Sequence, residues 1–171
     1  MKVVRVHAPG ADEAVGRSIE SAVRAFNASL DIRLRFLSIG IEERVLRVAD
    51  AEAAAEQVAA ALAASGGGPG ADVLVLLGGS EAAVAAAAAA ARSHVPVLRV
   101  GAGERTGRDA DAARSVDRMA SIAIVHGPAC AAALRDEGVA AEVEDVGDAR
   151  GAALGEHIVR VLSRARRRGP C

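Results

Sequence analysis

The sequence has almost no aromatic side chains, few cysteines and no excess of charge of either sign. Of its 171 residues, 1% are aromatic, and the formal net charge is −1. Nucleic-acid-binding proteins need positive charge and aromatic stacking platforms, so nucleic acid is excluded as an expected partner. Two cysteines, Cys130 and Cys171, are too few for a disulfide framework or a zinc site. We therefore predict free thiols, no metal and no cofactor.

The sequence also lacks an apolar run of the kind that targets or anchors a chain. Residues 1–7 do not form a signal-peptide core, and the longest apolar run, nearly all alanine, ends at Arg92 and His94. We expect a soluble cytoplasmic protein with no membrane partner. A chain of this length corresponds to about one domain. We assign residues 1–163 to that domain and 164–171 to a basic C-terminal tail.

What the sequence does contain is a regular alternation of two hydrophobic patterns, one typical of strands and one of helices. The predicted strands are 2–7, 32–36, 73–77, 95–100, 122–125 and 141–146. The predicted helices are 12–26, 50–64, 80–92, 109–120, 128–137 and 148–163, and segment 39–48 fits neither pattern. This order predicts an α/β protein, a single Rossmann-like three-layer domain with a mainly parallel sheet of about six strands.

Ligands of doubly wound sheets bind beyond the carboxyl ends of the strands, where four glycine-rich segments are predicted to lie. Backbone N–H groups in such turns, and the positive ends of the helices that follow, favour an anion such as phosphate. No segment has a complete dinucleotide-binding or P-loop motif, so tight strand-to-helix turns are the alternative explanation. The candidate ligand-binding residues are Pro9, Gly10, Gly78, Gly79, Ser80, Gly101, Gly103, Glu104, Arg105, Thr106, Asp109 and His126.

The loop 101–109 is the most polar of these segments. Glu104 could act as a general acid or base, and the Arg105 guanidinium could hold a carboxylate or phosphate. Alternatively, both side chains are solvated or pair with neighbours and close the loop. His126 could titrate near neutrality, although a single histidine in a loop is commonly structural. No nucleophile can be linked to a base, so no catalytic residue is assigned.

Two segments, ADVLVLLGGS (71–80) and VPVLRVGAGERTG (95–107), carry a family resemblance. They resemble the PDxVLVxGD and IPVxHVEAGLRTGD motifs in the N-terminal domain of the non-hydrolysing UDP-N-acetylglucosamine 2-epimerases. The segments DRMASIAIVH (117–126), ALRDEGV (133–139) and VGD (146–148) show a weaker likeness. The resemblance implies one lobe of a GT-B-like fold. Its specific matches are Ala102, Gly103, Arg105, Thr106 and Gly107.

The departures from the family pattern concern its acidic groups. The catalytic aspartate and glutamate of the family fall at Gly79 and Gly101, and the arginine-bearing loop after the first strand is replaced by residues 8–12. The paired glutamates reduce to Asp109 or Asp111. The family reaction eliminates UDP from the sugar and needs carboxylates to move the C2 proton, while a second domain holds most of the UDP. We therefore predict that this single lobe does not epimerise UDP-N-acetylglucosamine alone.

Two functions remain open at this point. The first is a non-catalytic or split-partner subunit in sugar-nucleotide metabolism, associated with a copy of itself or with a separately encoded chain that supplies the second lobe. The second is a small enzyme or binding protein for a UDP-sugar or a related phosphorylated ligand, with Glu104, Arg105, Asp109 and His126 in new roles. Stabilisation by UDP-sugars would favour the second function. Recovery of a partner without a ligand effect would favour the first.

Overall fold

One parallel six-stranded sheet organises the computed structural model, which describes residues 1–30, 41–63, 71–105 and 109–168. The strands are β1 (Lys2–His7), β2 (Glu42–Arg47), β3 (Val73–Leu77), β4 (Val97–Val100), β5 (Ile122–Val125) and β6 (Glu142–Asp145). Their order is β2-β1-β3-β4-β5-β6, and every neighbouring pair is parallel. The chain moves outward from β1 to β2 and then returns to β3 on the other side of β1. This reversal creates a switch point between β1 and β3.

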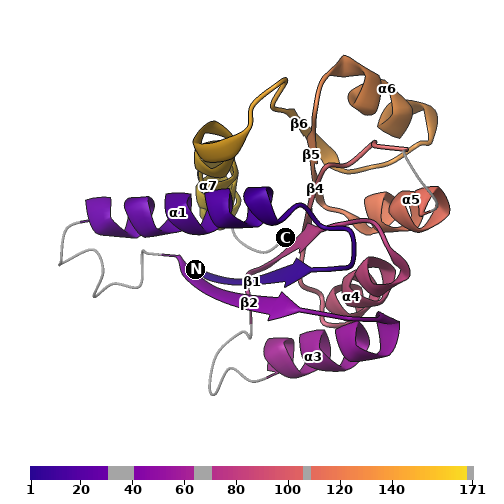
Figure 1. Cartoon of the computed structure of the whole chain (residues 1–171), viewed down its shortest axis with the longest axis horizontal. Coiled ribbons are helices and arrows are strands. Elements are labelled where there is room, and N and C mark those ends of the chain that lie inside the picture. The colour runs from indigo at the N-terminus through magenta and orange to yellow at the C-terminus, as the bar shows by residue number, and fades with distance from the viewer. Residues whose placement is uncertain (31–40, 64–70, 106–108, 169–171) are drawn as a thin grey trace.

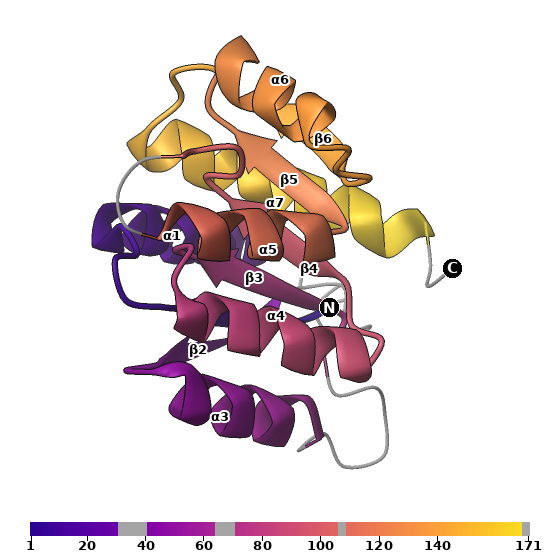
Figure 2. The same cartoon turned by 90° about the vertical axis from the view of Figure 1, so that its right-hand side faces the viewer.

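Helices cover both faces of the sheet, as Figures 1 and 2 show. The helices are α1 (Glu13–Ser29), α3 (Ala51–Ala63), α4 (Glu81–Arg92), α5 (Ala110–Met119), α6 (Pro128–Asp136) and α7 (Gly151–Arg168). Helices α1 and α7 pack together on one face, and α3, α4 and α5 pack on the other. Successive β3 residues alternate between the two cores, because Leu74 contributes to one and Val75 to the other. The Rossmann-like α/β prediction is confirmed.

The main difference from the predicted elements concerns the edge strand next to β1. Strand β2 lies inside segment 39–48, which fitted neither hydrophobic pattern, and Leu46 is its only buried residue. The predicted strand 32–36, the glycine-rich segment 66–70 and Thr106 lie outside the described residues.

The C-terminal helix also differs from its prediction at both ends. It begins at Gly151 rather than Asp148, and it continues through most of the expected tail to Arg168. Arg164 Nη2 lies 2.5 Å from Glu144 Oε1, so an ion pair to β6 supports the extra turn.

Helices α1 and α3 begin with a side-chain capping hydrogen bond, whereas α4 and α5 do not. Asp12 accepts the Ala14 N–H of α1 at 2.7 Å, and Asp50 accepts the Ala53 N–H of α3 at 2.8 Å. Ser80 and Asp109, at which the predicted helices begin, occupy the N-cap positions of α4 and α5, but neither side chain makes a capping hydrogen bond. The first turns of α4 and α5 therefore have backbone donors that their own N-cap side chains do not satisfy.

Candidate functional site

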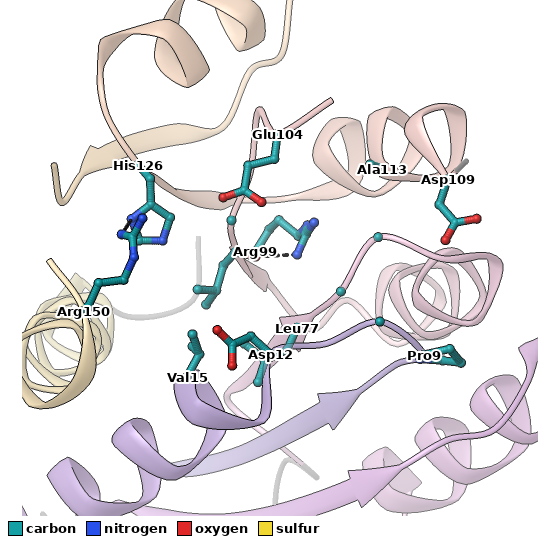
Figure 3. A pocket seen from close by; sticks show the side chains of 15 residues that line it. Pro9, Asp12, Val15, Leu77, Arg99, Glu104, Asp109, Ala113, His126 and Arg150 are labelled. Atoms are coloured by element: carbon teal, nitrogen blue, oxygen red, sulfur yellow. Dashed lines mark hydrogen bonds between the residues drawn. The ribbon is translucent and has the colours of Figure 1, made fainter. Parts of the chain in front are cut away.

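A cleft of about 340 Å³ lies at the carboxyl ends of β1, β3, β4 and β5 (Figure 3). It includes the switch point between β1 and β3, and its volume is in the range of small-molecule sites. The structure brings most of the predicted candidates together in its wall: Pro9, Gly10, Gly78, Gly79, Gly101, Glu104, Asp109 and His126. Ser80 is buried beside this wall, whereas Gly103 and Arg105 face the interior of the loop after β4.

Arg105 belongs to an internal ion-pair network and does not line the cleft. Its Nη1 lies 2.8 Å from Asp117 Oδ2, and its Nη2 lies 2.6 Å from Glu137 Oε2. The hydrogen bonds with Glu137 and Asp117 raise the pKa of Arg105, and the Arg105 hydrogen bonds lower the pKa of Glu137. The guanidinium thus closes the loop after β4 against α5 and α6. This arrangement corresponds to the alternative in which Arg105 pairs with neighbours.

Gly103 completes this closed loop. Its backbone has φ +79°, and its N–H donates to Asp117 Oδ2 at 3.0 Å. A Cβ at this position would overlap the carbonyl group of Cys130 in α6, so the packing itself requires glycine. Cys130 is half-buried and carries a free thiol.

Arg99 is a cleft residue that the sequence analysis missed. It lies on β4, is 5% exposed, and faces α5, where its Nε lies 3.4 Å from Asp117 Oδ1. Its Nη1 donates to the Val100 carbonyl. Burial lowers the pKa of Arg99, while the Asp117 and Glu104 carboxylates act in the opposite direction. The available signal was one charged residue inside the otherwise apolar run VPVLRV.

Two glycines leave room for charged side chains at the cleft floor. A Cβ at Gly79 would lie 2.9 Å from the Ala113 Cβ and 3.2 Å from Arg99 Nη2. Gly101 has φ +75°, and the position of its absent Cβ is 3.6 Å from the Glu104 carboxyl carbon. Glu104 therefore folds back over Gly101 and presents a carboxylate to the cleft, as Figure 3 shows.

His126 and Arg150 form the opposite wall of the cleft. Arg150 Nη1 lies 2.8 Å from His126 Nδ1, and because a guanidinium only donates, Nδ1 accepts. The neutral ring then carries its proton on Nε2. A longer contact of 3.3 Å between Nδ1 and the Gly147 carbonyl would need a proton on Nδ1, so we consider the Arg150 bond dominant. No spacing pattern distinguished Arg150 from other surface arginines.

The cleft combines both signs of charge. Asp12, Glu104 and Asp109 supply carboxylates, and Arg99 and Arg150 supply guanidinium groups. This set can bind a polar anionic ligand and offers Glu104 as a proton acceptor. In the described ranges, no group of histidine, cysteine and acidic residues is arranged to hold a metal ion, and no helix has the length and hydrophobicity to cross a membrane.

A second buried polar cluster lies under α1, outside the cleft. Arg5 is 2% exposed, its Nε lies 2.8 Å from Glu43 Oε1, and it donates to the Gly16 carbonyl. The His7 ring packs directly on Gly16, where a Cβ would overlap it, and His7 Nδ1 lies 3.6 Å from Glu13 Oε1. Burial, followed by the charge of Arg5, lowers the pKa of His7.

This cluster predicts that acid weakens the fold. Because the pKa of His7 is lower in the folded chain than its ordinary value of 6.5, the unfolded chain binds the proton first. Stability is therefore complete above about pH 6.5 and falls below it, by at most about 1.4 kcal/mol per pH unit from this group. Urea unfolding between pH 7.5 and 5 measures the slope, which His7→Gln should flatten. The exposed histidine variant His94→Gln should keep the original slope, and equal slopes in both variants would exclude His7 as the cause.

The fold and the cleft define a class: a doubly wound, Rossmann-like α/β domain with a cleft at its switch point. Comparison with solved structures places it beside the UDP-GlcNAc 2-epimerases. The Methanocaldococcus jannaschii enzyme is 17% identical, with a TM-score of 0.66 over 86% of this chain and 45% of that one. The Neisseria meningitidis enzyme bound to UDP-GlcNAc is 13% identical, with a TM-score of 0.66 over 98% and 52%. The Rickettsia bellii UDP-N-acetylglucosamine 2-epimerase is 17% identical, with a TM-score of 0.62 over 98% of this chain and 48% of that one.

These similarities concern the fold alone, because the identities are low. The chain spans about half the length of each of these epimerases. No protein-family model and no curated protein sequence matches it.

Proposed function

We propose that this chain is a sugar-nucleotide-binding lobe of the epimerase type, which holds a UDP-sugar or a related phosphorylated ligand without epimerising it alone. The observation that carries this proposal is the cleft at the switch point, where glycine turns meet Arg99, Arg150 and His126. Backbone N–H groups and guanidinium groups are the usual partners of phosphate oxygens. The fold likeness to epimerases, one of them bound to UDP-GlcNAc, supports the ligand class.

The positions of the acidic groups in the cleft support the part of the proposal that the lobe binds the ligand without epimerising it. Inverting C2 of a sugar requires proton transfer on both faces of that carbon. Gly79 and Gly101 offer no side chain, and Asp12 already accepts a backbone N–H as a helix cap. The Glu104 carboxyl carbon lies 3.6 Å from the position of a Cβ on Gly101. Loss of a general acid or base reduces a rate by about 10² to 10⁴.

We further propose that the lobe works with a second lobe, supplied by a copy of itself or by a separately encoded chain. The support is that the chain spans about half the length of the three epimerase structures named above, from 45% to 52%. Light scattering and pull-down with the purified chain test this association. A monodisperse monomer that recovers no partner and has full ligand affinity would contradict it.

The test of the main proposal separates binding from catalysis. We expect UDP-GlcNAc to raise the melting temperature of the purified chain, since ligand at 100 times its Kd stabilises a fold by about 2.7 kcal/mol. In D₂O, we expect no deuterium exchange at C2 above a protein-free sample, as measured by proton NMR. Exchange above that background would show that the lobe is an active enzyme.

A matched pair of arginine variants assigns the binding to the cleft. Arg150→Ala should reduce the UDP-GlcNAc-dependent shift, because Arg150 lines the cleft. Arg160→Ala removes the same charge from an exposed position on α7 and should leave the shift unchanged. Absence of stabilisation by any UDP-sugar in the wild-type chain would contradict the ligand class.

A further inference from the structure

The Asp145 carboxylate joins the two loops that carry His126 and Arg150. Asp145 is the last residue of β6. One of its oxygens, Oδ1, accepts two backbone hydrogen bonds, from the Gly127 N–H at 2.9 Å and from the Gly147 N–H at 2.8 Å. Gly127 belongs to the loop after β5, and Gly147 belongs to the loop after β6. A single atom therefore holds both loops together.

Both loops place a side chain in the wall of the cleft. Gly127 directly follows His126 in the sequence. A short turn, closed by a backbone hydrogen bond of 3.0 Å, leads from Gly147 to Arg150. Both side chains line the cleft, and Figure 3 shows them approaching each other there. By fixing the two backbones, Asp145 sets how far apart these side chains lie.

The contact between His126 and Arg150 decides which ring nitrogen can donate to a ligand. Arg150 Nη1 lies 2.8 Å from His126 Nδ1, and the Gly147 carbonyl lies 3.3 Å from the same nitrogen. The guanidinium only donates and the carbonyl only accepts, so the two partners require different tautomers of the neutral ring. While Arg150 keeps this distance, Nδ1 accepts and Nε2 carries the proton. Separation of the two loops would favour the other tautomer.

The Asp145 side chain itself is exposed and does not line the cleft. Its two hydrogen bonds, first that from Gly147 and then that from Gly127, lower the pKa of Asp145. The carboxylate therefore stays charged at neutral pH and remains a strong acceptor for both N–H groups. Because Asp145 adds nothing to the hydrophobic core, its contribution is the placement of the two loops.

We propose that Asp145 is a positioning residue for ligand binding, which acts by holding Arg150 against His126. Groups that bind a ligand must be held within about 0.5 Å of their productive position by the residues that support them. One oxygen that accepts from both loops provides this support for both side chains. The inference rests on the proposed function, because His126 and Arg150 would bind the phosphorylated ligand argued above.

Two substitutions separate the position of the acceptor from its charge. Asp145→Asn keeps an oxygen that can take the place of Oδ1 and removes the charge, whereas Asp145→Glu keeps the charge and moves the oxygens by one methylene group. We expect Asp145→Asn to resemble the wild-type chain and Asp145→Glu to resemble Asp145→Ala. Asp148→Ala is the matched control, because Asp148 is an exposed aspartate in the same loop.

Long-range ¹H–¹⁵N NMR of the full chain without ligand, recorded at alkaline pH, shows which nitrogen of the neutral His126 ring carries the proton. The spectrum of His126→Asn identifies these signals among the four histidines. We expect the Nε2–H form in the wild-type chain, in Asp145→Asn and in Asp148→Ala. The signals of Asp145→Ala and Asp145→Glu should move toward those of Arg150→Ala, which lacks the donor to Nδ1.

Isothermal titration with UDP-GlcNAc measures the consequence for binding. Asp145→Ala and Asp145→Glu should weaken the affinity about tenfold, similar to removal of a partner that orients a metal-binding histidine. Asp145→Asn and Asp148→Ala should bind as the wild-type chain does. Thermal unfolding of each variant reports any general loss of structure separately.

The ring signals and the affinity together distinguish this inference from the proposed function. Unchanged His126 signals in Asp145→Ala would overturn the positioning role, even if the affinity fell. Changed signals in Asp145→Asn with unchanged signals in Asp145→Glu would also overturn it, because the charge and not the position of the acceptor would then matter. A wild-type chain that binds no UDP-sugar would overturn the proposed function, while the ring signals still decide whether Asp145 holds Arg150 against His126.

Discussion

Replacement of Asp117 by alanine is expected to destabilise the protein by roughly 3 to 5 kcal/mol, the usual effect of breaking a buried ion pair. The Asp117 side chain is fully buried and accepts hydrogen bonds from the Gly103 N–H at 3.0 Å and from Arg105 at 2.8 Å. Arg99 Nε lies 3.4 Å from its other oxygen. Without this carboxylate, the buried Arg99 charge has no acidic group within ion-pair distance in the part of the chain that the structure describes. Chemical denaturation measures the difference in free energy of unfolding.

The matched control for this prediction lies on the same helix. Asp111 pairs with Arg114 at 2.7 Å, but the Asp111 side chain is 97% exposed. Asp111→Ala should therefore change stability by less than about 1 kcal/mol, as exposed ion pairs contribute little. If Asp117→Ala proved as mild as Asp111→Ala, the network around Asp117 could not be what holds the loop after β4.

Gly155→Ala is expected to destabilise the protein by about 3 kcal/mol, although alanine normally favours a helix over glycine by about 1 kcal/mol. Gly155 lies in α7, and a Cβ there would overlap the carbonyl oxygen of Ser18 in α1. Backbone cannot move aside as the end of a flexible side chain can, so α1 and α7 must separate. For a chain of this size, we expect the melting temperature to fall by roughly 6 to 12 °C.

A second substitution on α7 controls for the added atom. Ala152→Ser also adds one heavy atom, at an exposed position, and should change stability by no more than about 0.5 kcal/mol. A melting temperature that rises in Gly155→Ala would mean that helix propensity dominates and that α1 and α7 pack less closely than the structure shows.

The hydrophobic pattern was sufficient for buried strands and insufficient for an edge strand. Strand β3 is buried at every position, so its unbroken apolar run VLVLL is enough to predict a buried strand. Strand β2 reads EERVLR and buries only Leu46, because its neighbours cover little of it. Its place is set by backbone pairing with β1, from Lys2 opposite Glu42 to His7 opposite Arg47. Hydrogen bonds between backbone groups do not depend on side-chain hydrophobicity, so a hydrophobic pattern cannot reveal this pairing.

Part of the candidate site could be predicted from the sequence, and part could not. The glycine turns after the strands were predictable, since parallel strands end at one edge of the sheet. The partners of Arg105 were not, because Asp117 and Glu137 lie 12 and 32 residues further along the chain. Arg99 was hidden inside a run that resembles a buried strand. Whether Glu104, Asp109 and His126 contact a ligand stays a prediction.

The order of strands, helices and glycine turns could be read from the chain itself, since periodicity and backbone freedom are local properties. Three-dimensional packing alone decided which charged groups are neutralised inside the protein and which face the cleft. Arg105 is held by two carboxylates, whereas Arg99 lies 3.4 Å from one carboxylate and lines the cleft. The reason is that ion pairing depends on distance through space between residues far apart in sequence, and no local pattern encodes that distance.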